Sequence, residues 1–224
     1  MMKKRLFFAA AVLFALTLPL QCGAESRCEQ VLRDLGEIYG GLPGLSLEYR
    51  REVLSGASST VGEEPVQDVA EGQLYFKPPH FIKFHQLRPM EEHLITEGKN
   101  VWWYIPDKNK IERYPASFFG KQLSFLSEIL QGFSKGSESF RCDASTQEAG
   151  TVLILKPDPP WKDVEHIMIE VNHQHAIRSI SIRNQLGSTT RFVFDEMQVI
   201  DAFDEDFFKF SPPEGVRIED QGHH

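Results

Sequence analysis

The sequence predicts a mainly β protein of the α+β class, built on an antiparallel sheet that closes into a barrel or curves strongly. From Gly72 onward, apolar and polar residues alternate with a period of two, which is typical of half-buried strands. Turn residues separate these segments at regular intervals, as in sheets whose consecutive strands are neighbours. Helical spacing occurs in only a few segments, so we expect two or three helices beside the strands.

The composition is that of a folded single domain. The chain has 224 residues, of which 41% are hydrophobic, and this is enough to bury a core. The formal net charge is −8, which argues against a nucleic-acid partner because such partners are bound by basic surfaces. We find no internal repeat and no long linker, so we expect one domain.

The N-terminus has the layout of a cleaved secretory signal peptide. Basic residues at 3–5 precede an apolar run over 6–18, and small residues follow up to Ala24. The run is shorter than the roughly 20 residues that a transmembrane helix needs. We expect residues 1–24 to be removed and residues 25–224 to form the exported domain.

The three cysteines leave two questions open. Cys22 is an alternative, lipidated N-terminus, although Gln21 stands where lipidation signals usually have a small residue. Cleavage after the leader leaves Cys28 and Cys142, and an even pair in an exported protein usually forms a disulfide. The alternative is two separate buried thiols, because pairing geometry is not visible in a sequence.

The exported domain opens with a helix. Apolar residues recur at three- and four-residue steps over residues 28–39. Ser26 suits the N-cap, and Glu29 three residues later completes a capping box. Gly40 and Gly41 end the helix.

The first strands form a meander. A strand near residues 45–54 precedes a loop over 55–64, and two strands with a period of two flank Pro78. Glu97 and Gly98 form the turn of a hairpin. This turn predicts two sets of side chains on opposite faces, Leu94, Val101 and Trp103 on one and Ile95, Trp102 and Tyr104 on the other.

The middle of the chain changes period. An apolar stripe predicts a second helix, with Phe119, Leu123, Leu126, Ile129, Leu130 and Phe133 on one side. Segments with a period of two then return. They predict strands at residues 152–155, 164–171, 177–182, 189–199 and 207–210.

The sequence carries no catalytic constellation. It has no glycine-rich phosphate loop, no Gly-x-Ser-x-Gly elbow and no His-Glu-x-x-His motif. His173 and His175 are the best metal candidates, but they lack a nearby thiolate or carboxylate, so we interpret them as solvated turn residues. Glu91 and Glu92 are interpreted as a solvated face rather than an acid–base pair. We expect no enzyme activity, no metal and no other cofactor.

Aromatic residues are frequent and many occupy alternating strand positions. The chain has 17 Phe, 5 Tyr and 3 Trp. An ordinary filled core explains them, and so does an apolar cavity for a greasy ligand, as curved sheets can enclose. Periodicity does not distinguish the two.

Three segments resemble signatures of the outer-membrane lipoprotein carrier protein family (LolA). The segments are residues 72–84 (GQLYFKPPHFIKF), 94–106 (LITEGKNVWWYIP) and 208–216 (FKFSPPEGV). They occur in the order and spacing of the family, after a signal peptide, so the resemblance spans essentially the whole exported domain.

The resemblance implies an incomplete antiparallel barrel whose concave, apolar face is covered by helices. It implies a monomeric periplasmic chaperone that binds the acyl chains of lipoproteins. Members accept these from an inner-membrane ABC transporter and deliver them to a lipoprotein receptor on the outer membrane. The alternative is a lipid-anchored lipoprotein receptor, or a lipid-binding or sensor module of the same fold.

The resemblance also implies which side chains face the acyl chains, with ordinary core packing as the alternative for each. Ile82 and Phe84 are carried over by position, and strand alternation adds Leu74 and Phe76. Turn register adds Leu94, Val101 and Trp103. The matching residues of the second half are Ile167, Ile169, Ile180, Ile182, Phe192 and Phe194. The second helix, with its stripe from Phe119 to Phe133, is the expected lid.

One position departs from the family pattern. Many members have Arg where this chain has Pro78, and that Arg hydrogen-bonds the lid. Proline has neither the charge nor a backbone N–H to replace it. Arg50 and Arg51 are candidates for supplying the contact instead.

Overall fold

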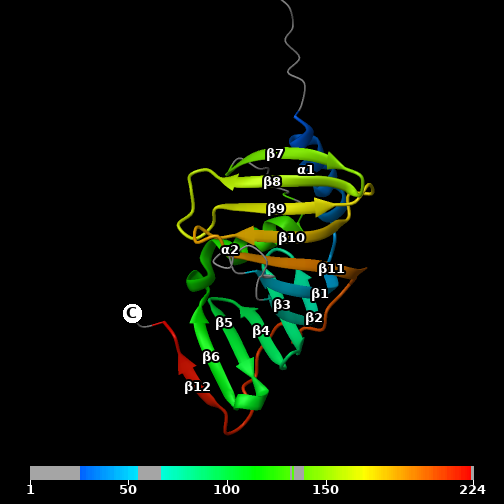
Figure 1. Ribbon diagram of the computed structural model, residues 1–224. Helices are drawn as coiled ribbons and strands as arrows, with labels where there is room; N and C mark the ends of the chain where they lie inside the picture. Colours follow the sequence, from blue (N-terminus) through cyan, green and yellow to red (C-terminus); the bar gives the residue numbers. More distant parts are fainter. Residues whose placement is uncertain (1–25, 55–66, 132, 134–138, 223–224) are drawn as a thin grey trace, which may run out of the picture.

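The computed structural model describes residues 26–54, 67–131, 133 and 139–222 (Figure 1). Of residues 67 and 118–124 it describes the backbone alone. The predicted leader, Cys22 and the predicted loop over 55–64 lie outside the described residues, as do the side chains of Phe119 and Leu123.

Twelve strands of the described residues form one open, curled sheet. Its order is β12-β6-β5-β4-β3-β2-β1-β11-β10-β9-β8-β7, so β1 joins two meanders (Figure 1). The strands are β1 (Leu45–Leu54), β2 (Gln67–Lys77), β3 (Phe81–Arg88), β4 (Glu92–Glu97), β5 (Asn100–Ile105), β6 (Lys110–Pro115), β7 (Phe140–Gln147), β8 (Gly150–Pro157), β9 (His166–Val171), β10 (Ile177–Arg183), β11 (Thr189–Val199) and β12 (Arg217–Asp220). A short 3-10 helix, η1 (Pro106–Lys108), links β5 to β6. The predicted mainly β fold class is confirmed.

The sheet bends where β2 meets β3. The register shifts between Glu71 and Gly72, which is the mark of a β-bulge. A Cβ at Gly72 would collide with the backbone carbonyl of His85, so only glycine permits this approach of the two strands. A second register shift, between Ser46 and Glu48, lies in the β1–β11 pair where the two meanders join. Bulges increase the local twist and bend of a sheet.

Helix α1 (Arg27–Tyr39) follows the predicted pattern. The Ser26 hydroxyl accepts from the Glu29 N–H at 3.2 Å, and the Glu29 carboxylate accepts from the Ser26 N–H at 2.8 Å, so the capping box is confirmed. Cys28 forms a disulfide with Cys142 of β7. The bridge closes a loop across 114 positions and ties the helix to the edge of the sheet.

Helix α2 (Ala116–Leu130) is shorter than its apolar stripe suggests. The prediction that Phe133 belongs to the helix is wrong, since its φ is 55°. The left-handed backbone ends the helical path but still turns the ring inward, 6.1 Å from the ring of Phe125.

Both helices pack on the concave face. Tyr39 and Leu35 of α1, Phe125 and Ile129 of α2, and inward side chains of β1, β2, β3 and β8–β11 form one buried cluster. The Tyr39 hydroxyl accepts the buried N–H of Ile177 at 3.0 Å. The helices therefore supply the apolar partner that the curled sheet lacks.

The C-terminal segment differs from the prediction. Residues 207–210 are not a strand; they cross the convex face as turns, with Phe207 5.0 Å from Tyr75 and Phe210 5.3 Å from Trp102, ring to ring. The chain then adds β12, which runs parallel to β6. Aromatic alternation does not identify strand pairing here, because a segment lying on a sheet also presents alternate side chains to it.

The sequence does not predict three of the strands, β6, β7 and β12. Of these, β7 and β12 form the two edges of the sheet. The period of two is present in β7, where Phe140, Cys142 and Ala144 pack toward the buried cluster, whereas β12 has four residues and Ile218 as its one apolar side chain. In β6, Ile111 is the one fully buried side chain.

We predict that Tyr39→Phe lowers the free energy of unfolding by about 1–3 kcal/mol, because the buried N–H of Ile177 loses its acceptor. Urea denaturation followed by circular dichroism measures this. Tyr104→Phe, at a half-buried tyrosine, is the control and should shift stability by less than about 0.5 kcal/mol. Equal effects of the two substitutions would contradict the prediction.

Candidate functional site

A cavity of about 240 Å³ lies on the concave side of the sheet. Three aromatic rings form its centre: Tyr49 lies 5.5 Å from Phe84 and 6.0 Å from Phe192, centroid to centroid. Leu94 and Trp103 extend the apolar wall. The full lining is Tyr49, Arg51, Phe84, Gln86, Glu92, Leu94, Trp103 and Phe192, from β1, β3, β4, β5 and β11.

Strand register brings these side chains together. Phe84 pairs with Leu94, and Leu94 pairs with Trp103, so the three lie in one row across the sheet. Arg51 of β1 is the cross-strand neighbour of Phe192 of β11, where the two meanders join. The ladder places Leu94 and Trp103 on one face and Ile95 with Trp102 on the other, as predicted. The turn itself is Gly98–Lys99, one residue later than predicted, because Glu97 still pairs with Asn100.

The rim of the cavity is polar. Glu92 accepts from the indole N–H of Trp103 at 2.9 Å, and the Gln86 amide donates to the Met90 carbonyl at 3.0 Å. Arg51 pairs with Asp68 at 3.3 Å. Burial raises the pKa of Tyr49 to about 12, and Arg51 opposes the shift while Glu92 adds to it.

One rim atom is left without a partner. Among the described residues, Nε of Arg51 is buried and makes no hydrogen bond. A buried donor without an acceptor costs about 1–3 kcal/mol. The cavity therefore has an apolar wall, and one side chain at its edge carries a buried donor without an acceptor.

The structure divides the thirteen expected cavity residues. Four of them line the cavity: Phe84, Leu94, Trp103 and Phe192. Eight are buried in the protein interior: Leu74, Phe76, Ile82, Val101, Ile167, Ile169, Ile180 and Phe194. Ile182 borders a separate, more polar cavity of about 520 Å³ between residues 162 and 190.

Sequence reasoning missed the polar part of the lining. Tyr49 and Arg51 continue the alternation that starts at Leu45, so assigning a face to the first strand would have found them. Glu92 is a correction, because it lines the cavity and holds Trp103 instead of forming a solvated face. A charged residue in a strand is interpreted as solvent-facing unless its cross-strand partner is known.

Helix α2 covers this side of the sheet and is tied to the turn after β2. Its Phe125, Ile129 and Leu130 are buried, and Leu126 packs against them. At its C-terminal end the Gln131 amide donates to the backbone carbonyl of Pro79 at 3.0 Å. The end of α2 is therefore hydrogen-bonded to the sheet at the Pro78–Pro79 turn. The donor is a side chain at the end of the helix, not an arginine of the sheet.

The two arginines proposed for that contact point to opposite faces. Arg50 pairs with Glu52 and Glu71, each at 3.0 Å. Arg51, one residue later, lines the cavity. Alternation along β1 sets this difference.

The histidines first considered as metal candidates have separate partners. Nε2 of His173 lies 2.9 Å from the carbonyl oxygen of Glu148, and Nδ1 of His175 lies 3.5 Å from Asp34. The expectation that neither has a carboxylate nearby is therefore wrong for His175, and the two histidines have different partners.

The fold and the cavity define a class: an open, curled antiparallel sheet with a covered apolar concave face. A solved structure shares this shape. An uncharacterized conserved protein from Thermus thermophilus superposes with a TM-score of 0.52 at 10% identity, over 86% of this chain and 98% of that one. Among the described residues, no helix is both long and apolar enough to cross a membrane.

Sequence comparison gives the family. The sequence model of the outer membrane lipoprotein carrier protein LolA matches residues 58–211, and the chain belongs to this family. An outer-membrane lipoprotein carrier protein of Haemophilus influenzae (strain PittEE) is 24% identical over 221 residues, covering 99% of this chain and 98% of the relative. Its counterpart in Azotobacter vinelandii is 24% identical over 217 residues, covering 96% and 97%.

We predict that Gln131→Ala loosens the C-terminal end of α2. Losing a hydrogen bond worth about 0.5–1.5 kcal/mol should raise the population with an exposed apolar face, and hence binding of the dye bis-ANS, about 2- to 10-fold. Gln185→Ala is a matched control, because its amide donates to the Val164 carbonyl at 3.1 Å in another turn. Equal dye fluorescence in both variants would refute the role of Gln131.

Proposed function

We propose that the protein is a periplasmic chaperone that binds the acyl chains of lipoproteins and carries them from the inner to the outer membrane. Its partners are an ABC transporter that releases lipoproteins from the inner membrane and a lipoprotein receptor on the outer membrane. The observation that carries the proposal is the apolar cavity on the concave face, together with membership of a family of lipoprotein carriers.

The energetics of acyl transfer demand such a surface. Each methylene moved from a membrane into water costs about 0.8 kcal/mol, so an acyl chain does not leave a bilayer unaided. A carrier must offer a comparable apolar surface and must hide it when empty. The rings of Tyr49, Phe84 and Phe192 supply the surface, and α2 supplies the cover.

We interpret this cavity as the binding site in its closed state, before a ligand enters. Its volume of about 240 Å³ lies below the roughly 300–1,000 Å³ of ordinary ligand pockets. Phe84 and Phe192 line the cavity and also pack against the buried cluster, so the cavity wall and the core are continuous. Displacement of α2 would add core side chains such as Leu74, Phe76 and Ile82 to the wall.

The polar rim suits the ester end of an acyl chain. Arg51 has an unused donor at the edge of an apolar wall, and an ester carbonyl is an acceptor that would satisfy it. The hydrocarbon would then lie toward Phe84 and Phe192.

The direct test is release of lipoproteins from spheroplasts. Purified protein is incubated with spheroplasts, and acylated lipoproteins are sought in the soluble fraction bound to it. A known carrier runs in parallel, and the cognate transporter is supplied. Failure of release under these conditions, with the known carrier active, would overturn the proposal.

We predict that Phe84→Glu abolishes loading, because a carboxylate in the apolar wall would be desolvated on cargo binding. Leu87→Glu on the same strand is the control, since Leu87 is 54% exposed and its variant should load normally. Circular dichroism establishes that both variants fold. Normal loading of folded Phe84→Glu would remove Phe84 from the site.

We also predict that Arg51→Leu lowers affinity for a fluorescent diacylated lipopeptide about 10-fold, the equivalent of one hydrogen bond from a charged donor. Affinity for an apolar dye without an ester should stay unchanged. Arg50→Leu is the matched control, because Arg50 faces away from the cavity. An equal loss for dye and lipopeptide would contradict the assigned role of Arg51.

A further inference from the structure

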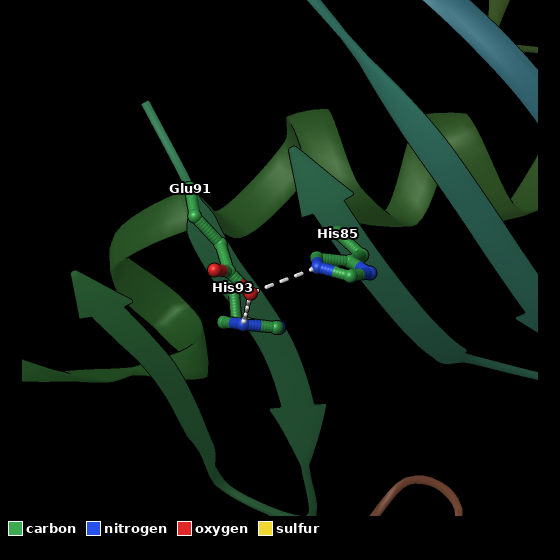
Figure 2. Close-up of side chains that lie close together, drawn as sticks. All are labelled: His85, Glu91 and His93. Atoms are coloured by element: carbon green, nitrogen blue, oxygen red, sulfur yellow. Dashed lines mark hydrogen bonds and ion pairs between the residues drawn. The ribbon is translucent and has the colours of Figure 1, made fainter. Parts of the chain in front are cut away.

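Two histidines and a glutamate meet on the face of the sheet opposite the cavity. Figure 2 shows His85 on β3 and His93 on β4 converging on Glu91, which precedes β4. His85 lies between Phe84 and Gln86, and both of these line the cavity. Strand alternation therefore turns His85 outward, and the same holds for His93 between Glu92 and Leu94.

The ligand atoms already converge. Oε1 of Glu91 lies 3.2 Å from Nε2 of His85 and 3.0 Å from Nε2 of His93 (Figure 2). The three candidate ligand atoms lie within 4.8 Å of one another. Ligands at zinc bond lengths of about 2.0–2.2 Å in a tetrahedral site lie roughly 3.3 Å apart. A small outward movement of the glutamate would admit an ion.

Packing holds the histidines in place. They are direct cross-strand partners, and their rings stack at 4.4 Å with 15° between the planes. The ring of His93 also stacks on Tyr104, 5.9 Å away. The sheet holds both histidines side by side, and rotation of a ring out of the stack would let both Nε2 atoms point at one ion.

The cluster is accessible from solvent. The side chains are 29% exposed for His85, 21% for His93 and 49% for Glu91, which leaves room for water as a fourth ligand. Lys83 is the nearby positively charged side chain that would compete with a metal ion for this site. Its ammonium lies 4.3 Å from the ring of Phe207 and donates to the Phe207 carbonyl, so the C-terminal segment engages it.

We infer that His85, Glu91 and His93 form a binding site for a divalent transition-metal ion, and that Zn²⁺ fits it best. Two imidazoles and one carboxylate are the ligand types of borderline ions, whereas Mg²⁺ and Ca²⁺ prefer oxygen ligands. The ion would clip β3 to β4 directly behind Phe84 and Leu94.

The test is calorimetric titration of the exported domain with ZnCl₂. The substitutions His223→Ser and His224→Ser are made first, because adjacent terminal histidines are themselves metal ligands. We expect one Zn²⁺ per chain and no comparable binding of MgCl₂. Lack of stoichiometric Zn²⁺ binding overturns the inference.

Variants locate the ion. His93→Ala and Glu91→Gln should each weaken Zn²⁺ binding by at least about 10-fold, since even outer-shell partners of metal ligands are worth that much. His173→Ala, in a separate turn, should bind as the parent does. Unchanged affinity in both cluster variants, or an equal loss in His173→Ala, overturns the assignment.

A stability measurement guards against misfolded variants. Glu91→Gln keeps the size of the side chain, and circular dichroism establishes its fold. Zn²⁺ should raise the Tm of the parent but leave the Tm of Glu91→Gln unchanged, because an ion that binds only the native state stabilises it. An equal rise in both proteins places the ion elsewhere.

Discussion

The concave face of the curled sheet imposes the main constraint on this fold. A twisted sheet of twelve strands in the described chain presents inward a surface of Leu, Ile and Phe that the strands cannot bury among themselves. Helices α1 and α2 meet that need, and the Cys28–Cys142 bridge ties α1 to β7. Where their cover ends, around Tyr49, Phe84 and Phe192, a cavity remains.

Because the helices cover the concave face only in part, this fold has space for a ligand. A core filled by rigid neighbours has no room for a ligand, whereas one covered by a helix can exchange protein contacts for ligand contacts. Helix α2 is joined to the first meander by a side-chain hydrogen bond from Gln131 to Pro79. This bond adds to the burial of Phe125, Ile129 and Leu130, which holds the helix on the sheet.

Alternate residues of the same strands serve two faces with different chemistry. Along β3, Phe84 and Gln86 face the cavity, while Lys83 and His85 face outward. Part of the outward face is covered, because Phe207 and Phe210 of the C-terminal segment lie on Tyr75 and Trp102. The histidine pair lies on this face as well, so a ligand on either side of β3 and β4 acts on the same backbone.

The sequence by itself determined whatever depends on neighbours in the chain. Ser26 and Glu29, three residues apart, cap a helix, and the tight turn after Glu97 sets the faces of Leu94 and Trp103. Only the tertiary structure decided which strands meet: it paired His85 with His93 and placed Arg51 beside Phe192. It also turned Glu92 into a cavity residue and placed β7 and β12 at the edges of the sheet. Local hydrogen bonds and turns are encoded within a few residues, whereas cross-strand neighbours depend on register and curvature, which the whole apolar surface sets together.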